Sequence, residues 1–249
     1  LLVVSTDGED FAEVDELELL GLRDVTIVDG TWWMVGWRGF LAHTTDPRSG
    51  WEQVETRVGA QLYAVRVDES GRVWISGDNG FLGVYDGQAL TQVDVGAEER
   101  LGALGIHGDV VHVAGEDGVL RTVPRAGGEV LERPLGTNET ITGLTVTAAG
   151  TVVVVGYRGY VGRFDAGADR PQIIHAGTFE DLEGVVTLPD GRIVITGDEG
   201  VVLVSEDDGE SFRAFPSGTT SHLWQPTVLG NGIVLGSSEG AGLRFALPA

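Results

Sequence analysis

The chain has 249 residues, contains no cysteine and carries a formal net charge of -22, with a sequence pI of about 4.3. The missing cysteines exclude disulfides, thiol catalysis and thiolate metal sites. A surface this acidic repels phosphate backbones, so the composition argues against nucleic acid as a partner. No apolar run approaches the length of a membrane span, and we expect no direct membrane insertion. The sixteen basic residues are all arginine.

Short β-prone segments follow one another along the whole chain. Residues 1–15 supply LLVVST and FAEVD, and residues 222–249 supply LWQPTVL, GIVLGS and LRFALP. Between these ends lie five similar units, at residues 22–55, 62–95, 101–133, 141–175 and 182–215. Each unit alternates strand-like segments with turns rich in Gly and Asp, which predicts four short antiparallel strands per unit. Residues 12–22 are compatible with a helical turn or with a strand and loop.

One glycine phrase recurs in every unit. It reads VGWRGFL at residues 35–41, and four related phrases also contain two glycines separated by two variable residues. A looser copy, LGSSEGAGL from Leu235, has three residues between its first two glycines. The first glycines are Gly36, Gly77, Gly115, Gly156, Gly197 and Gly236. These positions are 38 to 41 residues apart, and a period near forty with four strands per unit is typical of a β-propeller.

We therefore predict an all-β fold, a single β-propeller domain over residues 1–249 built from four-stranded antiparallel blades. Six copies of the glycine phrase favour six blades; seven is the alternative if two further strands lie upstream. The C-terminal segment supplies only three strands. We expect FAEVD from the N-terminus to complete that last blade, so that the two ends close the ring and cover an exposed edge.

Three turns between third and fourth strands share a pattern of Ser or Thr, Asp and an aromatic residue. They read STDGEDF from Ser5, TTDPRSGW from Thr44 and SEDDGESF from Ser205. These turns resemble the Asp-box of BNR repeats. Together with the glycine phrase, they make the chain similar to the propeller group that contains the photosystem II stability and assembly factor and its relatives in non-photosynthetic bacteria. The resemblance implies a propeller over nearly the whole chain, but such a fold hosts many functions. We expect the Asp-box to be structural, with Asp and Ser satisfying backbone donors of a tight turn.

Overlaying the units separates scaffold positions from positions that are free to serve function. Every first strand is predicted to begin with an aliphatic residue, whereas the next position differs in all six units. It reads Arg23, Tyr63, Gly102, Thr142, Glu183 and Trp224. In a propeller this position lies at the mouth of the central channel, on the face that also displays the two residues between the glycines. We call these residue pairs the tips.

Two tips pair an aromatic residue with arginine: Trp37–Arg38 and Tyr157–Arg158, which would face each other across a six-bladed ring. Arg, Trp and Tyr dominate binding hot spots at protein interfaces. The alternative is local, with the aromatic ring folded over its neighbour and the arginine paired with a nearby acid. We predict binding residues Trp37, Arg38, Tyr157 and Arg158 at the tips, and Arg23, Tyr63, Glu183 and Trp224 at the channel mouth.

Catalytic motifs are missing from the sequence. We find no nucleophile elbow, phosphate loop or dinucleotide fingerprint, and the five histidines lack metal-ligand spacing. Arg23, Tyr63 and Glu183 resemble part of a sialidase site, but that family uses three arginines. We predict no metal, no cofactor and a non-catalytic scaffold that binds another protein within a larger assembly.

Two alternatives stay open. One is a carbohydrate-binding or glycoside-hydrolysing, sialidase-like propeller, in which Trp224 and Tyr63 stack on a sugar and Glu183 acts as acid or base. The other is a structural repeat domain of a longer polypeptide. Composition leaves the compartment undecided between the two redox environments, with an extracytoplasmic or secreted location slightly favoured.

Overall fold

The computed structural model describes residues 3–4, 12–13, 21–229, 232–237 and 242–245. In these ranges the only helices are short 3-10 turns, and none of them could span a membrane. The chain divides into two compact units, Leu1–Leu104 and Gly105–Ala249, which are described separately.

The first unit contains one two-stranded and two four-stranded antiparallel sheets. The sheets are β1 (Val3–Val4) with β2 (Ala12–Glu13); β3 (Leu22–Val28), β4 (Thr31–Gly36), β5 (Leu41–Thr44) and β6 (Glu52–Gln53); and β7 (Leu62–Val67), β8 (Val73–Gly77), β9 (Leu82–Tyr85) and β10 (Leu90–Val93). β1 and β2, which belong to the predicted segments LLVVST and FAEVD, pair with each other. Whether they also complete the last blade stays a prediction, and most of residues 12–22 lie outside the described ranges.

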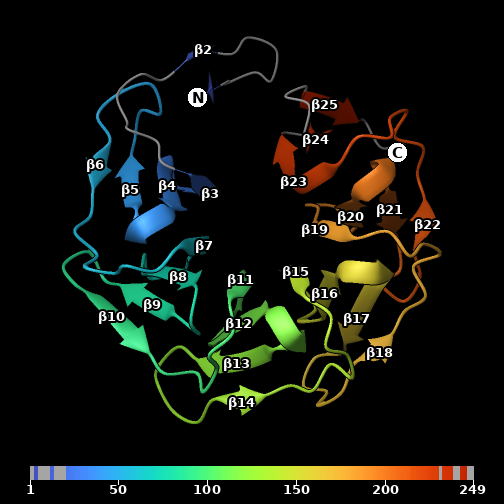
Figure 1. The fold of residues 1–249 in the computed structure, drawn as a ribbon, viewed down its shortest axis with the longest axis horizontal. Helices are drawn as coiled ribbons and strands as arrows, with labels where there is room; N and C mark the ends of the chain where they lie inside the picture. Colours follow the sequence, from blue (N-terminus) through green and yellow to red (C-terminus); the bar gives the residue numbers. More distant parts are fainter. Residues whose placement is uncertain (1–2, 5–11, 14–20, 230–231, 238–241, 246–249) are drawn as a thin grey trace. The chain divides into compact units, whose positions relative to one another are not determined.

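The second unit contains most of a further sheet that begins with β11, together with two four-stranded sheets and one three-stranded sheet. The strands are β11 (Leu101–His107), β12 (Val110–Gly115), β13 (Leu120–Pro124) and β14 (Leu131–Glu132); β15 (Ile141–Val146), β16 (Val152–Gly156), β17 (Tyr160–Phe164) and β18 (Gln172–Ile173); β19 (Leu182–Thr187), β20 (Ile193–Gly197), β21 (Val202–Ser205) and β22 (Arg213–Ala214); and β23 (Leu223–Leu229), β24 (Gly232–Ser237) and β25 (Gly242–Phe245). In each four-stranded sheet the strands follow chain order, as Figure 1 shows for β15 to β18.

The predicted strand pattern is confirmed in the described residues. Five sheets are four-stranded and antiparallel, and the C-terminal segment supplies three strands. Each first strand begins at the predicted aliphatic residue: Leu22, Leu62, Leu101, Ile141, Leu182 and Leu223. All of these side chains are fully buried except Leu22, which is half-buried.

The core of each unit lies between consecutive sheets. In the first unit, Val35 and Leu41 of one sheet pack with Leu62, Val65 and Ile75 of the next. A cluster of the same kind joins β16 and β17 to β19 and β20 in the second unit. The second strand of a sheet is buried along its whole length in β8, β16 and β20, because its two faces contact different neighbours. This burial explains why these strands are almost continuously apolar.

The glycine phrase contacts the loop that leads into the following first strand. In four of the five phrases with a described second glycine, the backbone N–H of that glycine donates to a carbonyl in this loop. The bonds are Gly39 N to Ala60 O at 2.7 Å, Gly80 N to Glu99 O at 2.8 Å, Gly118 N to Glu139 O at 3.1 Å and Gly200 N to Ser221 O at 3.0 Å. These second glycines also have φ between 64° and 72° in the phrases from Gly39 to Gly200. They are therefore required by the turn, as predicted.

The first glycine of the phrase has a different reason. Gly197, for example, is extended at φ -171°, which any residue can adopt. A Cβ atom there would lie 2.3 Å from the carbonyl oxygen of Asp181, however. The close approach of the neighbouring backbone, rather than the turn conformation, excludes a side chain at this position.

The two described turns that resemble the Asp-box form the tight-turn hydrogen bonds that we expected of them. In the second unit the Ser205 hydroxyl donates to Asp207 Oδ1 at 2.7 Å and accepts from the N–H of Gly209 at 2.8 Å. Asp207 also accepts from the N–H of Ser211 at 3.0 Å. The turn from Thr44 forms a similar network around Asp46. The first Asp-box, residues 5–11, lies outside the described residues.

The link between sheets can be tested by replacing its second glycine. A Cβ on Gly80 would lie 1.8 Å from the carbonyl oxygen of Ala97, at a φ of +64°. We expect Gly80→Ala to lower the free energy of unfolding by roughly 2–4 kcal/mol in urea denaturation. Gly71→Ala is the matched control, because Gly71 has φ +81° and open space around its Cβ position. The control should cost only about 1 kcal/mol; equal losses would show that backbone conformation alone explains the glycine.

Candidate functional site

The divergent column predicted from the repeats coincides with a series of β-bulges. The pairing between first and second strands shifts between Leu22 and Asp24, and the same shift recurs in three further sheets. The skipped residues are Arg23, Tyr63, Thr142 and Glu183, while the last sheet skips Trp224 together with Gln225. A bulge leaves its extra residue out of the ladder and redirects its side chain. Residue identity in the column can therefore vary among the sheets, because a bulged residue takes no part in strand pairing.

In the first unit, the column and a tip form one cluster. The Arg23 guanidinium carbon lies 5.8 Å from the ring centre of Trp37 and 5.3 Å from that of Tyr63. Arg100 approaches the Tyr63 ring at 5.2 Å. These distances are in the range of cation–π contacts. The structure thus brings together three predicted residues, Arg23, Tyr63 and Trp37, and adds Arg100, which the sequence analysis missed.

Trp37 and Arg38 behave differently within their tip. Trp37 is 45% exposed and lies over Gly21, where an added Cβ would meet the indole ring at 2.4 Å. Arg38 is exposed in a left-handed conformation, and within the described part of the chain its side chain has no ion pair or hydrogen bond. The ring is therefore held by the scaffold, whereas the guanidinium of Arg38 points to solvent.

The tip Tyr157–Arg158 borders a cavity in the second unit. The cavity has a volume of about 430 Å³, and its lining includes both tip residues together with Ile173 and Phe179. The residues Ile173 and Phe179 are 61% and 84% exposed, which is unusual for large apolar residues. Arg158 Nη1 lies 3.4 Å from Glu139 Oε1, so the local alternative, an arginine paired with a nearby acid, is partly realised.

Glu183 and Trp224 lie around a shared histidine in the second unit. Burial raises the pKa of Glu183, and the nearby Asp198 and Asp181 raise it further, while His222 opposes them. His222 Nδ1 contacts the Asp198 carboxylate. Its ring stacks on Trp224 with 6.1 Å between centres, and Trp224 is 50% exposed. This arrangement offers a carboxyl group that holds its proton more readily than usual, beside an exposed aromatic surface.

The missed residues share one position in the repeat. Arg100, Asp181 and His222 each immediately precede the first residue of a first strand. The other units have Gly21, Gln61 and Thr140 there. This position diverges as strongly as the predicted column, so comparing it among the units would have found all three. The predicted opposition of the two aromatic–arginine tips stays a prediction.

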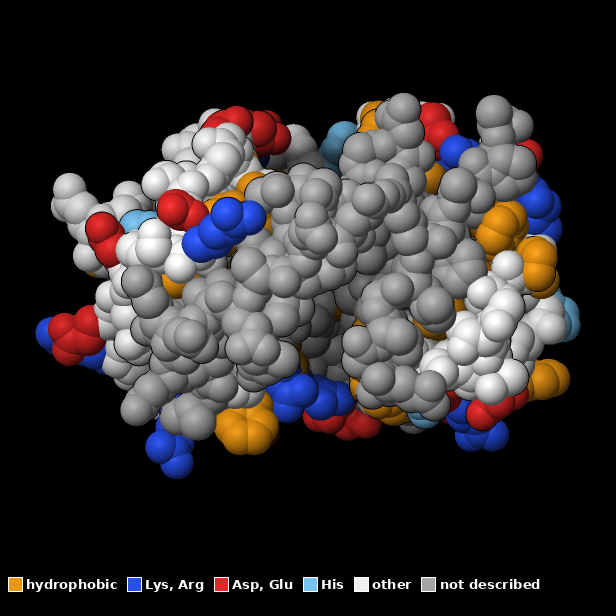
Figure 2. Space-filling view, turned by 90° about the horizontal axis from the view of Figure 1, so that it is seen from above, with side chains coloured by type: hydrophobic (Ala, Val, Ile, Leu, Met, Phe, Trp, Pro, Cys, Tyr) orange, Lys and Arg blue, Asp and Glu red, His pale blue; other side chains and the backbone are white. Residues whose placement is uncertain are grey.

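Most described arginines outside the first-unit cluster pair with acidic side chains. Figure 2 shows arginine and acidic side chains next to each other at several places on this face of the molecule. Ion pairs involve Arg57, Arg66, Arg72, Arg121, Arg133, Arg158, Arg163, Arg192 and Arg213. Among the described residues, no group of three or more His, Asp or Glu side chains is arranged to hold a metal ion.

Comparison with solved structures identifies the fold. The chain is similar to YCF48 bound to D1 peptide, with a TM-score of 0.71 and 17% identity over 91% of this chain and 78% of that one. It is also similar to YCF48 from Cyanidioschyzon merolae, with a TM-score of 0.70 and 12% identity over 90% of this chain and 81% of that one.

A third structure is a catalytically inactive virginiamycin B lyase from Staphylococcus aureus with quinupristin. Its TM-score is 0.81 and its identity 11%, over 94% of this chain and 83% of that one. No family model and no curated protein matches the sequence. At these identities the likeness shows the fold alone: the chain has a β-propeller fold similar to that of YCF48, which confirms the predicted resemblance in fold.

The raised pKa of Glu183 predicts a pH-dependent effect on stability. A carboxyl group whose pKa is higher in the folded state destabilises that state once ionised, so its cost appears as pH rises through the unfolded and then the folded pKa. We expect Glu183→Gln to increase the free energy of unfolding at pH 7. The gain should disappear below about pH 4, where the carboxyl group is protonated in both states. Urea denaturation at both pH values measures this, and a loss of stability at pH 7 would contradict it.

Proposed function

We propose that this propeller is a non-catalytic scaffold that binds another protein through the edges of its sheets that carry the tips and the bulged column. The observation that carries the proposal is the cluster of Arg23, Trp37, Tyr63 and Arg100. In a lysine-free chain with a net charge of -22, two arginines stacked with two aromatic rings at one edge form a distinctive local surface. These residue types carry much of the binding energy in protein interfaces.

The tip of the second unit supports the same proposal. Ile173 and Phe179 leave large apolar surfaces exposed beside Tyr157 and Arg158, around a cavity that could take one anchoring side chain. An apolar pocket rimmed by charged groups is a common feature of protein interfaces. We propose that an apolar residue of a partner occupies this cavity. At the first-unit cluster, treated by itself, we propose that acidic groups of a partner contact Arg38 and the two arginines.

The proposal of a peptide or protein ligand is also supported by one of the similar propellers, since YCF48 has been solved bound to D1 peptide. We propose that our chain acts as one component of a larger assembly, on a single domain of six blades closed by its two ends, with seven blades as the alternative. The likeness in fold leaves the partner unspecified, and the residue chemistry above defines which surface should be tested.

The binding surface is tested by replacing tips. The wild-type protein is used to capture partners from the lysate and culture fluid of its native host, and the affinity for each purified partner is then measured. We expect Trp37→Ala with Arg38→Ala, and separately Tyr157→Ala with Arg158→Ala, to weaken binding about tenfold or more, since both would remove hot-spot residues. Circular dichroism should show unchanged folding.

The matched control is Asp78→Ala with Asn79→Ala. This tip belongs to the same unit as Trp37, and Asn79 has φ 56° where Arg38 has 54°, so the backbone change is equivalent. We expect its affinity to stay within about twofold of wild type, because the replaced side chains are not of the hot-spot types. Unchanged affinity in both aromatic–arginine variants, or an equal loss in the control, would refute the assignment of the surface.

A carbohydrate-active role is the second candidate, and the environment of Glu183 favours it. A glycosidase needs one carboxyl group with a raised pKa and a second carboxylate nearby. Glu183 has a raised pKa, and Asp181 and Asp198 influence it. Trp224 and Tyr63 are the candidate sugar-stacking residues. Hydrolysis of chromogenic glycosides that is lost in Glu183→Gln would establish this role, whereas a wild type without activity or glycan binding would leave the protein-binding proposal.

A further inference from the structure

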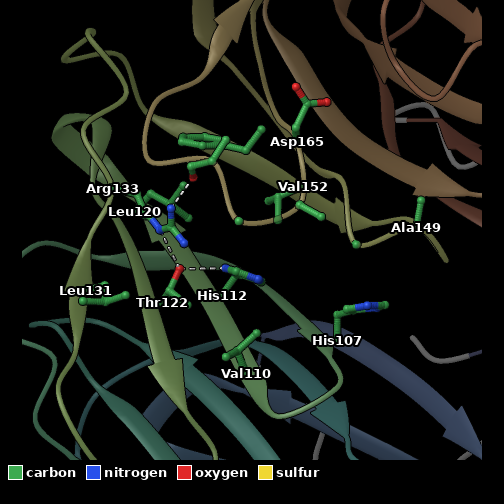
Figure 3. A pocket seen from close by; sticks show the side chains of 15 residues that line it. His107, Val110, His112, Leu120, Thr122, Leu131, Arg133, Ala149, Val152 and Asp165 are labelled. Carbon is green, nitrogen blue, oxygen red and sulfur yellow. Dashed lines mark hydrogen bonds between the residues drawn. The ribbon is translucent and has the colours of Figure 1, made fainter.

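A second cavity of the unit Gly105–Ala249 lies between the sheets β11–β14 and β15–β18 (Figure 3). It is lined by residues of the turns that join first to second and third to fourth strands. Because neighbouring strands are antiparallel, these turns and the tips lie at opposite ends of the strands. The volume is about 330 Å³, which is in the range of small-molecule sites. The buried side chains of Leu120, Val152 and Phe164 give the cavity an apolar wall.

Two nitrogen-bearing side chains meet at one buried hydroxyl in this cavity. His112 and Thr122 are paired across β12 and β13, and both are more than nine-tenths buried, with exposures of 7% and 4%. His112 Nδ1 lies 2.9 Å from Thr122 Oγ1. Arg133, immediately after β14, donates from Nε to the same oxygen at 3.4 Å. The buried Thr122 hydroxyl therefore forms hydrogen bonds with both His112 and Arg133, and these bonds fix the orientation of the two side chains.

The hydrogen bonds of the shared hydroxyl allow the tautomer of His112 in which Nδ1 accepts, and we assign that tautomer as part of the proposal below. Since Thr122 Oγ1 accepts from Arg133, its own hydrogen can be donated to His112 Nδ1. Burial lowers the pKa of His112 to about 4, with further lowering by Arg133 and His107, so the ring is neutral near pH 7. A neutral ring that accepts at Nδ1 carries its hydrogen on Nε2. That nitrogen has no partner within the described residues, and Figure 3 shows the ring directed into the cavity.

Arg133 brings a largely buried guanidinium group to the cavity. Its side chain is only 14% exposed, and its carboxylate partner Asp169, 3.3 Å away, is 96% exposed and therefore screened by water. Arg133 Nη1 also contacts the Ala168 carbonyl, whereas Nη2 has no partner in the described part of the chain. The lining also contains one carboxylate, Asp165, which pairs with Arg163 at 2.5 Å, while Arg163 pairs with Asp208 at 3.3 Å as well. The buried guanidinium of Arg133 is the group in this cavity that favours an anionic ligand.

We propose that this cavity binds a small organic carboxylate. The carboxylate accepts hydrogen bonds from Arg133 Nη2 and His112 Nε2, and the apolar body of the ligand lies against Leu120, Val152 and Phe164. Arginine is suited to this task because its planar guanidinium matches a carboxylate and stays charged when buried. The site is separate from the surface proposed for protein binding, so either proposal can fail without the other.

The test uses two acids, benzoate and hexanoate, each compared with its uncharged amide. Binding to the chain of residues 1–249 is followed by NMR through the imidazole signals of His112. We expect saturable shifts with at least one acid and affinity about tenfold or more weaker for its amide, since the amide lacks the charge that Arg133 recognises. The signals of His222, which is not part of the cavity, should stay unchanged. Equal binding of acid and amide, or no saturable shift with either acid, overturns the proposal.

Arg133→Met removes the charge while keeping an unbranched side chain, and it should weaken binding of the acid about tenfold or more. Arg213→Met is the matched control, because Arg213 lies on β22 and pairs with Glu206 outside the cavity. Ala149→Phe, at an exposed lining position, should block entry even if Arg133→Met fails to fold. Wild-type affinity in a folded Arg133→Met protein, or in Ala149→Phe, would contradict the assigned site.

Discussion

The hydrogen bond from the second glycine of each phrase to the loop before the next first strand is the constraint on which the rest of the structure depends. It fixes where one sheet ends relative to where the next begins, in each of the four pairs for which it is observed. The same loop leaves no room for a side chain, as the 1.8 Å approach of Ala97 O to a Cβ on Gly80 shows. The backbone hydrogen bond and the excluded side chain together fix how the glycine phrase contacts the loop that follows it.

That constraint also places the functional candidates. The loop that accepts the hydrogen bond leads directly into the bulged column, so tips and column residues come close at the same edge. In the first unit this proximity stacks Arg23 between Trp37 and Tyr63. In the second unit the N–H of Arg158 donates to Asp181 Oδ1 at 2.8 Å, one residue before a first strand. Scaffold contact and candidate binding surface are thus neighbours along the backbone.

The periodicity of the sequence was sufficient to predict where the strands lie, because four antiparallel strands per forty residues leave a regular pattern of apolar residues and turns. It predicted that first strands begin at Leu62 and Leu182. It also found Arg23 and Tyr63, by comparing repeats. The bulge itself could not be read, since a bulge depends on the register with the partner strand. The sequence analysis missed Arg100 and His222, which immediately precede a first strand. Comparing the repeats at that position would have found them as well.

The cavity around His112 marks a different limit. The histidines showed no ligand spacing in the sequence, and nothing local joins His112, Thr122 and Arg133. Pairing of β12 with β13 places the first two side by side, and the end of β14 brings the arginine to the same hydroxyl. Sites that depend on several strand pairings become visible only once the register of every strand is known.

The left-handed backbone at the second tip position limits which residue types can stand there and contact a partner. Arg38, Asn79, Asp117, Arg158 and Glu199 all have φ between 52° and 58°. β-Branched residues are strongly disfavoured in that conformation, so Val, Ile and Thr are poor choices there however well they would suit a partner. The first tip position carries no such restriction and accommodates Trp37 as readily as Asp78. When these turns vary, in evolution or in a designed library, we therefore expect residues of any size and shape at the first tip position. At the second tip position we expect flexible polar or charged residues.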